Sequence, residues 1–363
     1  MQRKRYIAVA GLAGVALTMS ACGSSSGTGG GSGSSSSSAA KAGKVGVILP
    51  DTKSSARWET ADRPNLQAAF DAAGVEVVID NANGDKSQMQ TIADQMLSSG
   101  VNVLMIVNLD SGTGKAVLDK AKAQGVATID YDRLTLGGSA SYYVSFDNVS
   151  VGKLQGEGLA KCLGDKKANI VYLNGSPTDN NATLFAQGAH EVLDPMTNYT
   201  VVDEQAVPDW DNQQAATIFE QMLTKNKQID GVLAANDGLG NAAISILKKN
   251  SLNGKVPVTG QDATVEGLQN VLAGDQCMTV YKAVKQEADA ASKLAIALAN
   301  GETPTVSGVT KDAEGNRDVP SELLVPQAIF KDNVKDVVTD GFVTKEELCT
   351  GDFAALCTDA GIS

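Results

Sequence analysis

The 363-residue sequence contains a single histidine, His190, and few aromatic side chains, among which only two are tryptophans. With one imidazole available, general acid–base catalysis would have to rest on carboxylates, lysine or tyrosine. We expect His190 to lie on a helix face without a functional role. No spacing of Cys and His is typical of a zinc site. The sequence therefore predicts no metal centre.

Positive charge is also scarce, because 30 Lys and Arg stand against 42 Asp and Glu and leave a net charge of −12. Nucleic-acid binding relies on neutralising phosphates with Lys and Arg, so no nucleic-acid partner is expected. The first apolar run, Val45–Leu49, leads into Pro50-Asp51-Thr52-Lys53-Ser54-Ser55 and not into a Gly-x-Gly-x-x-Gly turn. Without that turn the pyrophosphate cradle of a dinucleotide-dependent dehydrogenase is missing. We expect neither an enzyme nor a bound cofactor.

The longest apolar run near the N-terminus, Tyr6 to Leu17, is too short for a comfortable transmembrane helix. It follows three basic residues and closes with Met19-Ser20-Ala21-Cys22-Gly23, which resembles a bacterial lipobox with Met19 where Leu is more common. This predicts a signal peptide over residues 1–21 and a lipid-carrying Cys22; the alternative is an ordinary signal peptide cleaved nearby. Residues 22–43 are mostly Gly and Ser, a composition typical of a flexible tether.

Four further cysteines are compatible with an exported protein, because disulfides persist in oxidising compartments. Four cysteines allow three connectivities, and the sequence alone does not choose among them. Cys349 and Cys357 close a short loop near the C-terminus, which favours that bridge, with Cys162–Cys277 as the second. The alternative is that these cysteines are buried free thiols.

From Lys44 onward, short β-branched runs alternate with amphipathic stretches of helical length. The predicted strands are Val45–Leu49, Val75–Ile79, Val101–Val107, Val126–Ile129, Tyr142–Phe146, Ile170–Leu173, Thr200–Val202, Gly231–Ala235, Val256–Thr259 and Thr279–Lys282. Such alternation is typical of βαβ units and of parallel sheets covered by helices on both faces. The predicted fold class is α/β.

The alternation breaks once, at the strand Tyr142–Phe146, which predicts a boundary between two lobes. The N-terminal lobe would comprise residues 44–147 and about 283–318, and the C-terminal lobe 148–282 and about 319–363. Repeated crossings imply several hinge strands, an arrangement suited to opening and closing about a ligand.

Residues 303–325 are predicted to form a β-hairpin. A calcium loop there is disfavoured, since Arg317 and Leu323 stand where such a loop has Gly and Glu.

Polar side chains follow the apolar runs, and in open α/β sheets ligands bind beyond the carboxyl ends of the strands. The candidate ligand-binding residues are Arg57, Trp58, Asn108, Asp132, Arg133, Asn148, Asn180, Asn181, Trp210, Asn236, Asp262 and Lys282. Carboxylates and amides pair well with hydroxyls that both donate and accept, and indoles pack on the C–H faces of a sugar ring. These residue types predict a carbohydrate site.

Each feature has a simpler interpretation. The two tryptophans could be surface packing, and Asp132–Arg133 could be a structural ion pair. One of Asn180 and Asn181 could be a helix N-cap, and Asn236-Asp237-Gly238 could be a turn. Their common placement at strand ends is what favours the site.

The body of the chain, about Lys44 to Leu348, resembles the type I periplasmic sugar-binding proteins, and within them the D-xylose-binding members that serve bacterial ABC importers. The matching pieces are Arg57-Trp58, Asn81-Ala82-Asn83-Gly84, Tyr131-Asp132-Arg133, Ser145-Phe146-Asp147-Asn148, Gly175-Ser176-Pro177-Thr178-Asp179-Asn180-Asn181-Ala182, Ala235-Asn236-Asp237, Gly260-Gln261-Asp262-Ala263 and Met278-Thr279-Val280-Tyr281-Lys282. The resemblance implies two Rossmann-like lobes joined by hinge strands. It also implies that Trp58 and Trp210 stack on the sugar and that the polar candidates bond it, Asn180 being the alternative to Asn181.

The resemblance further implies a monomer that delivers D-xylose, or a close monosaccharide, to an ABC permease and its ATPase. Together with Cys22 it implies a lipid anchor at the extracellular face of the cytoplasmic membrane, as expected for Gram-positive bacteria. Two alternatives stay open: the same role for ribose, arabinose or glucose, and a sugar-sensing domain that reports to a membrane receptor.

Overall fold

The computed structural model describes residues 43–362. The predicted signal peptide, Cys22 and nearly all of the tether lie outside these residues. Within residues 43–362, no helix combines the length and apolar character needed to cross a bilayer.

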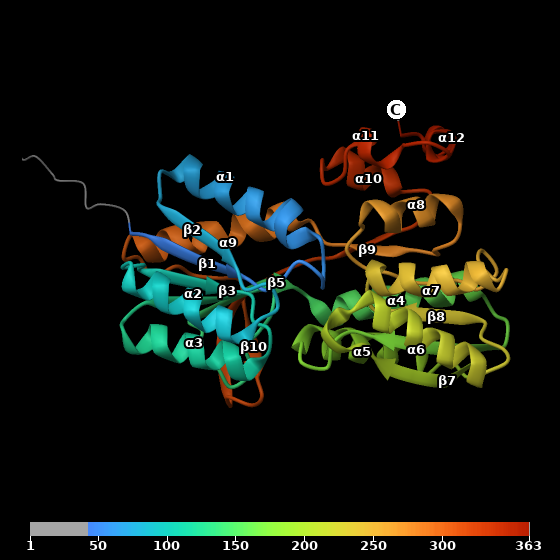
Figure 1. The fold of residues 1–363 in the computed structure, drawn as a ribbon, viewed down its shortest axis with the longest axis horizontal. Helices are drawn as coiled ribbons and strands as arrows, with labels where there is room; N and C mark the ends of the chain where they lie inside the picture. The colour runs from blue at the N-terminus through green and yellow to red at the C-terminus, as the bar shows by residue number, and fades with distance from the viewer. Residues whose placement is uncertain (1–42, 363) are drawn as a thin grey trace, which may run out of the picture. The chain divides into compact units, whose positions relative to one another are not determined.

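The first lobe is built on a sheet whose described strands run in the order β10-β11-β5-β4-β3-β1-β2 (Figure 1). The strands are β1 (Val45–Leu49), β2 (Val77–Asn81), β3 (Val103–Ile106), β4 (Ala127–Tyr131), β5 (Tyr142–Phe146), β10 (Gly308–Asp312) and β11 (Arg317–Leu324). All neighbours pair in parallel except β10 and β11. The part β2-β1-β3-β4-β5 is a doubly wound order whose direction of winding reverses between β1 and β3.

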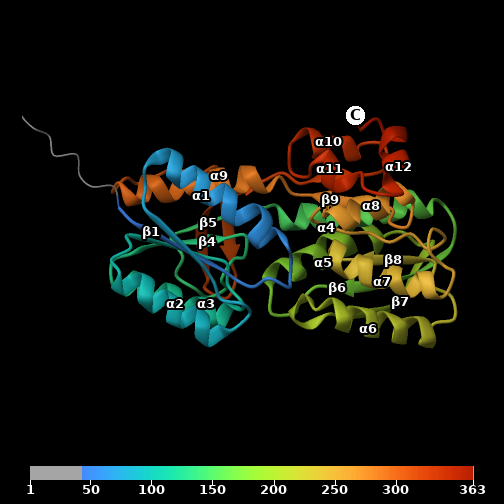
Figure 2. The ribbon, with the colours of Figure 1, turned by 45° about the horizontal axis from the view of Figure 1, so that its top comes forward.

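Helices cover both faces of this sheet, with α1 and α9 on one side and α2 and α3 on the other (Figures 1 and 2). Their bounds are α1 (Arg63–Ala73), α2 (Lys86–Ser98), α3 (Ser111–Ala123) and α9 (Val284–Ala299). Side chains alternate along β1, so that Val47 packs with α1 and α9 while Ile48 packs with α2 and α3. The continuous apolar runs of the sequence thus reflect burial on both faces.

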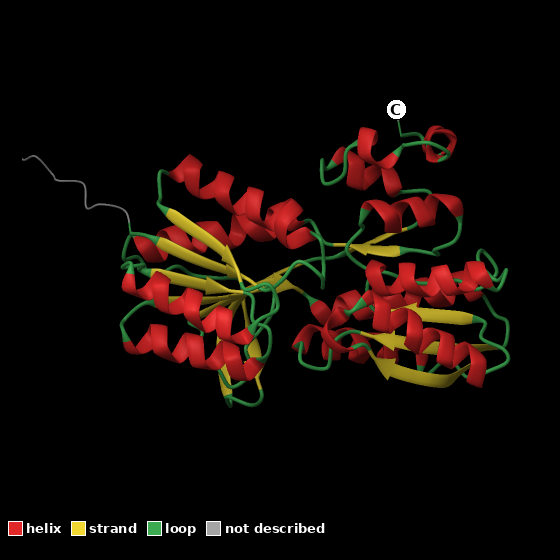
Figure 3. Ribbon diagram, viewed as in Figure 1, coloured by secondary structure: helices red, strands yellow, loops and turns green. Residues whose placement is uncertain are grey.

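The second lobe repeats the pattern, with α4 and α5 packed against one face of β6 and α6 and α7 against the other (Figure 3). Its elements are α4 (Asn148–Leu163), β6 (Ala168–Asn174), α5 (Asn180–Leu193), β7 (Tyr199–Ala206), η2 (Pro208–Trp210), α6 (Asn212–Lys225), β8 (Gly231–Ala234), α7 (Asp237–Lys249), α8 (Val265–Ala273), β9 (Thr279–Tyr281) and β12 (Gln327–Ile329). The parallel sheet has the order β7-β6-β8, and β9 pairs with β12. The α/β class predicted from the sequence is confirmed.

The strand predicted over Val256–Thr259 is wrong, because only Val258 makes an isolated bridge, to Val232. The neighbouring Pro257 accepts a hydrogen bond from Val232 through its carbonyl oxygen. Proline has no N–H to donate in return, so a regular ladder cannot continue through it.

The chain crosses between the lobes after β5, after β9 and after β11, so three segments join the lobes. The crossing expected near residues 318–319 lies later, because β11 pairs with β5 from Ser321 to Leu324. The hairpin is present, and its turn is held by Asp312, which accepts hydrogen bonds from the backbone N–H groups of Gly137 and Gly315.

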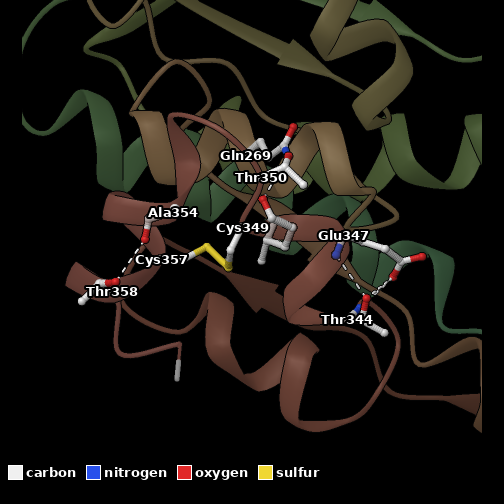
Figure 4. Close-up of a disulfide and its surroundings, with 9 residues drawn as sticks. Gln269, Thr344, Glu347, Cys349, Thr350, Ala354, Cys357 and Thr358 are labelled. Atoms are coloured by element: carbon white, nitrogen blue, oxygen red, sulfur yellow. Dashed lines mark hydrogen bonds between the residues drawn. A yellow bond between two sulfur atoms is a disulfide. The ribbon is translucent and has the colours of Figure 1, made fainter.

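The structure pairs Cys162 with Cys277 and Cys349 with Cys357, the connectivity that the sequence favoured. The second bridge clips the C-terminal tail, which contains α10 (Val334–Thr339), α11 (Lys345–Leu348) and α12 (Phe353–Asp359). Figure 4 shows this disulfide beside Gln269 of α8, whose side-chain amide donates to the carbonyl oxygen of Leu348 at 3.0 Å. Leu348 and Cys357 are buried against α8, so the tail is part of the second lobe's core.

Replacing Cys349 and Cys357 together by serine is expected to lower the free energy of unfolding by about 2–3 kcal/mol. The loop they close is short, with a sequence separation of 8, and the entropy removed from the unfolded chain is correspondingly modest. Urea unfolding of the variant and the wild type measures the difference. A variant as stable as the wild type would show that packing against α8 alone holds the tail.

Candidate functional site

The carboxyl ends of the central strands of both lobes converge on one cavity of about 30 Å³. Its lining residues are Ser54, Ser55, Arg57, Trp58, Asp132, Arg133, Asp179, Asn181, Phe185, Trp210, Asn236, Gln261, Asp262 and Lys282. In the first lobe these residues follow β1 and β4, on either side of β3 and next to the reversal of strand order. This is where doubly wound sheets bind ligands.

Arg57 lies at the start of η1 (Trp58–Asp62), a π-helical turn that leads into α1. Its guanidinium donates to both carboxylate oxygens of Asp62, at 2.8 and 2.7 Å, and to Oδ2 of Asp132 at 2.9 Å. A fourth hydrogen bond, of 2.5 Å, reaches Glu287 of α9. Because Arg57 is 4% exposed, this set of carboxylates supplies the partners that its buried charge requires.

Asp132 directly follows β4 and has a left-handed backbone conformation, with φ of 61°. Its carbonyl oxygen accepts from Ser145, Tyr143 and the side chain of Asn181, so neighbouring elements hold the strained residue in place. Burial acts to raise the pKa of the Asp132 carboxyl, but nearby Lys282, Arg57 and Arg133 outweigh it and hold that pKa below its ordinary value. Asp132 therefore presents a carboxylate to the cavity.

The second lobe contributes Asp262, which has φ of 95°, and Lys282 at the end of β9. The Nζ atom of Lys282 lies 3.4 Å from Oδ1 of Asp262 and 3.7 Å from Oδ2 of Asp132. One ammonium group thus stands between a carboxylate of each lobe. A ligand hydroxyl placed there can donate to either carboxylate and accept from the lysine.

The two tryptophans lie at the same cavity, both nearly buried. The guanidinium of Arg57 lies 4.6 Å from the ring centroid of Trp58, a cation–π arrangement that holds the indole. The indole N–H of Trp210 donates to Asp179 Oδ2 at 3.1 Å. Trp210 also has φ of 55°, which is rare for a bulky side chain and marks a residue held in place by its surroundings.

Several contacts join the lobes around the cavity. The Nε atom of Arg133 lies 2.9 Å from Oδ2 of Asp179, and both side chains are buried. Asn236 donates to the carbonyl oxygen of Ser54 at 3.3 Å, and Ser55 donates to Asp262 at 3.2 Å. Burial raises the pKa of the Asp179 carboxyl, and Arg133 offsets only part of that rise.

Three predicted residues do not line the cavity. Asn108 donates to the side chain of Thr135 and the carbonyl oxygen of Arg133, so it shapes the loop after β4. Asn148 donates to Asn181 at 2.9 Å and thereby orients a residue that does line the cavity. Asn180 is the first residue of α5, and the N-cap is Asp179, not either asparagine. Asn108 and Asn148 thus contact residues that shape or line the cavity, whereas Asn180 makes no such contact among the described residues.

Five lining residues were not among the predicted binding residues: Ser54, Ser55, Asp179, Phe185 and Gln261. Ser54 and Ser55 share the loop after β1 with Arg57, and Gln261 precedes Asp262, so their strand-end position was the available signal. Asp62 and Glu287, behind Arg57, were also missed. Glu287 lies three residues after Val284 and four before Ala291, both buried, and this spacing places it on the buried stripe of α9.

Comparison with known proteins agrees with this architecture. The periplasmic binding protein domain family matches residues 45–303 of the chain. The chain belongs to this family. The family and the relatives of this chain are substrate-binding transport proteins and not enzymes.

This binding protein is 36% identical over 310 residues to the D-xylose-binding periplasmic protein of Escherichia coli (strain K12), a match that covers 84% of this chain and 92% of that protein. It is 33% identical over 320 residues to the multiple sugar-binding periplasmic receptor ChvE of Rhizobium radiobacter, covering 82% and 90% of the two chains. A solved ABC transporter solute binding protein from Clostridium phytofermentans, with bound β-D-glucose, matches with a TM-score of 0.77 and 28% identity over 84% of this chain and 99% of that one. The fold is that of the type I periplasmic sugar-binding proteins, as the sequence predicted.

The position of the Trp210 indole in this binding protein can be tested at Gly175. A Cβ atom added there would lie 2.0 Å from Cη2 of Trp210, so Gly175→Ala must displace the ring. We expect a loss of about 1–3 kcal/mol in the free energy of unfolding and a shift in tryptophan emission. Gly308→Ala is the matched control, since its nearest contact would be 3.7 Å away. Equal melting temperatures for both variants would contradict the packing of Trp210 against Gly175.

Proposed function

We propose that this binding protein captures D-xylose, or a closely related monosaccharide, between its lobes and delivers it to the permease of an ABC importer. The observation that carries the proposal is the polar lining of the cavity. Asp132 and Asp262 would accept from hydroxyls and Arg57 and Lys282 would donate, while Trp58 and Trp210 line the same cavity. A neutral polyol satisfies such a mixed set, whereas an anion would require an excess of cations.

The number of polar groups is sufficient for tight binding. Hydrogen bonds to charged groups contribute about 1.5–3 kcal/mol each. Five or six of them, less the cost of ordering, reach roughly −8 kcal/mol, which corresponds to micromolar affinity. The 36% identity to a D-xylose-binding protein favours D-xylose as the sugar.

Binding requires the polar side chains to change partners. The space of about 30 Å³ adjoins hollows of about 530 and 210 Å³ that share Ser54 with it. Within that space, polar side chains of the two lobes bond to one another across the cleft. A sugar would enter as the three connecting segments let the lobes part, and its hydroxyls would replace contacts such as Lys282–Asp262. Closure around the sugar would then expel water from the polar contacts.

The proposal extends to the location of the protein. With Cys22 lipidated and residues 23–40 as a tether, the lobes would work at the outer face of the cytoplasmic membrane. A sensory role would use the same cavity, so it is distinguished only by deleting the gene: loss of sugar uptake supports transport, and intact uptake with lost signalling supports sensing.

Isothermal titration calorimetry across D-xylose, D-ribose, L-arabinose, D-glucose and xylitol tests the ligand. We expect D-xylose to bind with one site per chain and a dissociation constant of about 1 μM or lower. A thermal shift at saturating sugar should follow from mass action. If none of these compounds produces heat or a thermal shift, the proposed function is wrong; if another sugar binds most tightly, only the choice of D-xylose is wrong.

A further inference from the structure

Three lining residues, Arg57, Asp132 and Lys282, belong to a buried cluster of charged groups that has too few cations. Arg57 and Lys282 carry the positive charge, and Asp62, Asp132 and Glu287 carry the acidic groups. If all five were ionised, three negative charges would face two positive ones, and Lys282 is also shared with Asp262. Such an excess is costly in a site removed from water, so the cluster favours keeping a proton.

The hydrogen bonds indicate which acid keeps it. Asp62 receives two bonds from Arg57 and a third, of 2.6 Å, from the hydroxyl of Tyr131. Asp132 receives one from Arg57 and one from Asn181. Glu287 receives a single bond, from Arg57, and its Oε1 atom has no partner among residues 43–362. Of the three carboxyl groups, that of Glu287 therefore receives the fewest hydrogen bonds.

The surroundings of Glu287 agree with this assignment. Its side chain is fully buried, and the charged and titratable groups that act on it or are acted on by it are Arg57, Asp62, Tyr131, Asp132, Tyr143 and Lys282. Burial raises the pKa of the Glu287 carboxyl to about 8, and Arg57 offsets only part of that rise.

We propose that Glu287 is a positioning residue that holds the proton of this cluster: as the neutral acid it fixes one edge of the Arg57 guanidinium and leaves Asp132 as the anionic partner that meets the sugar. Loss of the proton would make Glu287 a competing anion for Arg57 and add a negative charge behind Asp132. The guanidinium would then be drawn toward α9 and away from the cavity. This inference rests on the proposed sugar site, since it describes what orients that site.

The test is the pH dependence of sugar affinity in the wild type, Glu287→Gln and Glu287→Ala. Wild-type affinity should be level below about pH 8 and fall up to about tenfold per pH unit above it, because the ionised form must first regain its proton. Glutamine keeps the shape and neutrality of the acid, so Glu287→Gln should bind within about threefold of wild type at pH 7 and stay level to pH 9.5. Glu287→Ala removes the partner that holds the Arg57 guanidinium on the side of α9 and should bind at least about tenfold more weakly.

Asp130→Asn is the matched control. Burial raises the pKa of Asp130 to about 7, but its carboxylate accepts from Thr135 and does not line the cavity. Its affinity profile above pH 8 should follow the wild type. Wild-type affinity that is unchanged to pH 9.5, or a Glu287→Gln profile that falls with the wild type, would overturn the proposal.

A second measurement keeps the two proposals separable. The folded protein keeps a proton on Glu287 that the unfolded chain releases above its ordinary pKa of 4.5. That contribution to stability is complete below pH 4.5 and is lost as the pH rises to about 8. Glu287→Gln should therefore lose less thermal stability than wild type between pH 5 and 8, whether or not a sugar binds. An equal loss overturns the role of Glu287, whereas absence of sugar binding at pH 7 overturns the proposed function alone.

If Glu287→Gln does not fold, the number of protons that the wild type takes up when sugar is titrated at pH 8.5 tests the role of Glu287. Zero uptake contradicts the inference.

Discussion

Asp132→Asn is expected to weaken sugar binding about 100- to 1,000-fold, measured by calorimetric titration at pH 7. The substitution keeps the shape of the side chain but removes a charge that Arg57 contacts at 2.9 Å and that Lys282 approaches at 3.7 Å. Hydrogen bonds to a charged group contribute about 1.5–3 kcal/mol each, a neutral amide retains part of that energy, and each 1.4 kcal/mol is tenfold in affinity. The fold should survive, because Arg57 retains Asp62 and Glu287.

Asp110→Asn is the control for this experiment. Asp110 follows β3 in the same lobe, caps α3 through a 2.8 Å bond from the N–H of Thr113, and does not line the cavity. Asparagine caps helices about as well as aspartate, so affinity should stay within about twofold. A threefold or smaller loss for Asp132→Asn would remove Asp132 from the binding site.

Asp179→Asn is expected to destabilise the closed arrangement of the lobes and to weaken sugar binding by about two orders of magnitude. Asp179 Oδ2 faces both Arg133, at 2.9 Å, and the indole N–H of Trp210, at 3.1 Å. Removing one partner of a buried ion pair costs about 3–5 kcal/mol, because the other charge stays buried without compensation. In the wild type, Asp179 Oδ1 accepts from the N–H of Asn181 and caps α5. Asparagine preserves this acceptor, so a loss of affinity reports the removal of the negative charge and not the loss of the helix cap.

A double-mutant cycle with Arg133→Gln distinguishes loss of the Arg133–Asp179 ion pair from independent local effects of each substitution. If the two residues act as one pair, the double variant should bind little worse than either single variant, with a coupling of about 1–3 kcal/mol. Small-angle scattering with saturating sugar should show a larger radius of gyration for Asp179→Asn than for wild type. Fully additive losses would show that the two side chains act independently.

The fold was largely predictable, since β1 and β5 have the predicted bounds and helices alternate with strands as the apolar periodicity indicated. Errors came where tertiary pairing decides. Pro257 interrupts a run that is apolar enough for a strand, and β11 remains in the first lobe because it pairs with β5. Neither pairing partner can be read from the local sequence.

The residues of the candidate site were predictable where they directly follow a strand. Nine of the proposed binding residues line the cavity: Arg57, Trp58, Asp132, Arg133, Asn181, Trp210, Asn236, Asp262 and Lys282. Asp62 and Glu287 were not predictable in this way, because they lie within helical segments and gain their importance from Arg57, which packs on them in three dimensions. A residue that acts through another side chain need not follow a strand, so its position in the sequence does not mark it as part of a site.

A crystal structure of the protein grown with D-xylose tests the central claim most directly. We predict one sugar between Trp58 and Trp210, with carboxylate oxygens of both Asp132 and Asp262 within hydrogen-bond distance of its hydroxyls. A sugar bound away from these side chains, or one held by a single lobe, would contradict the account.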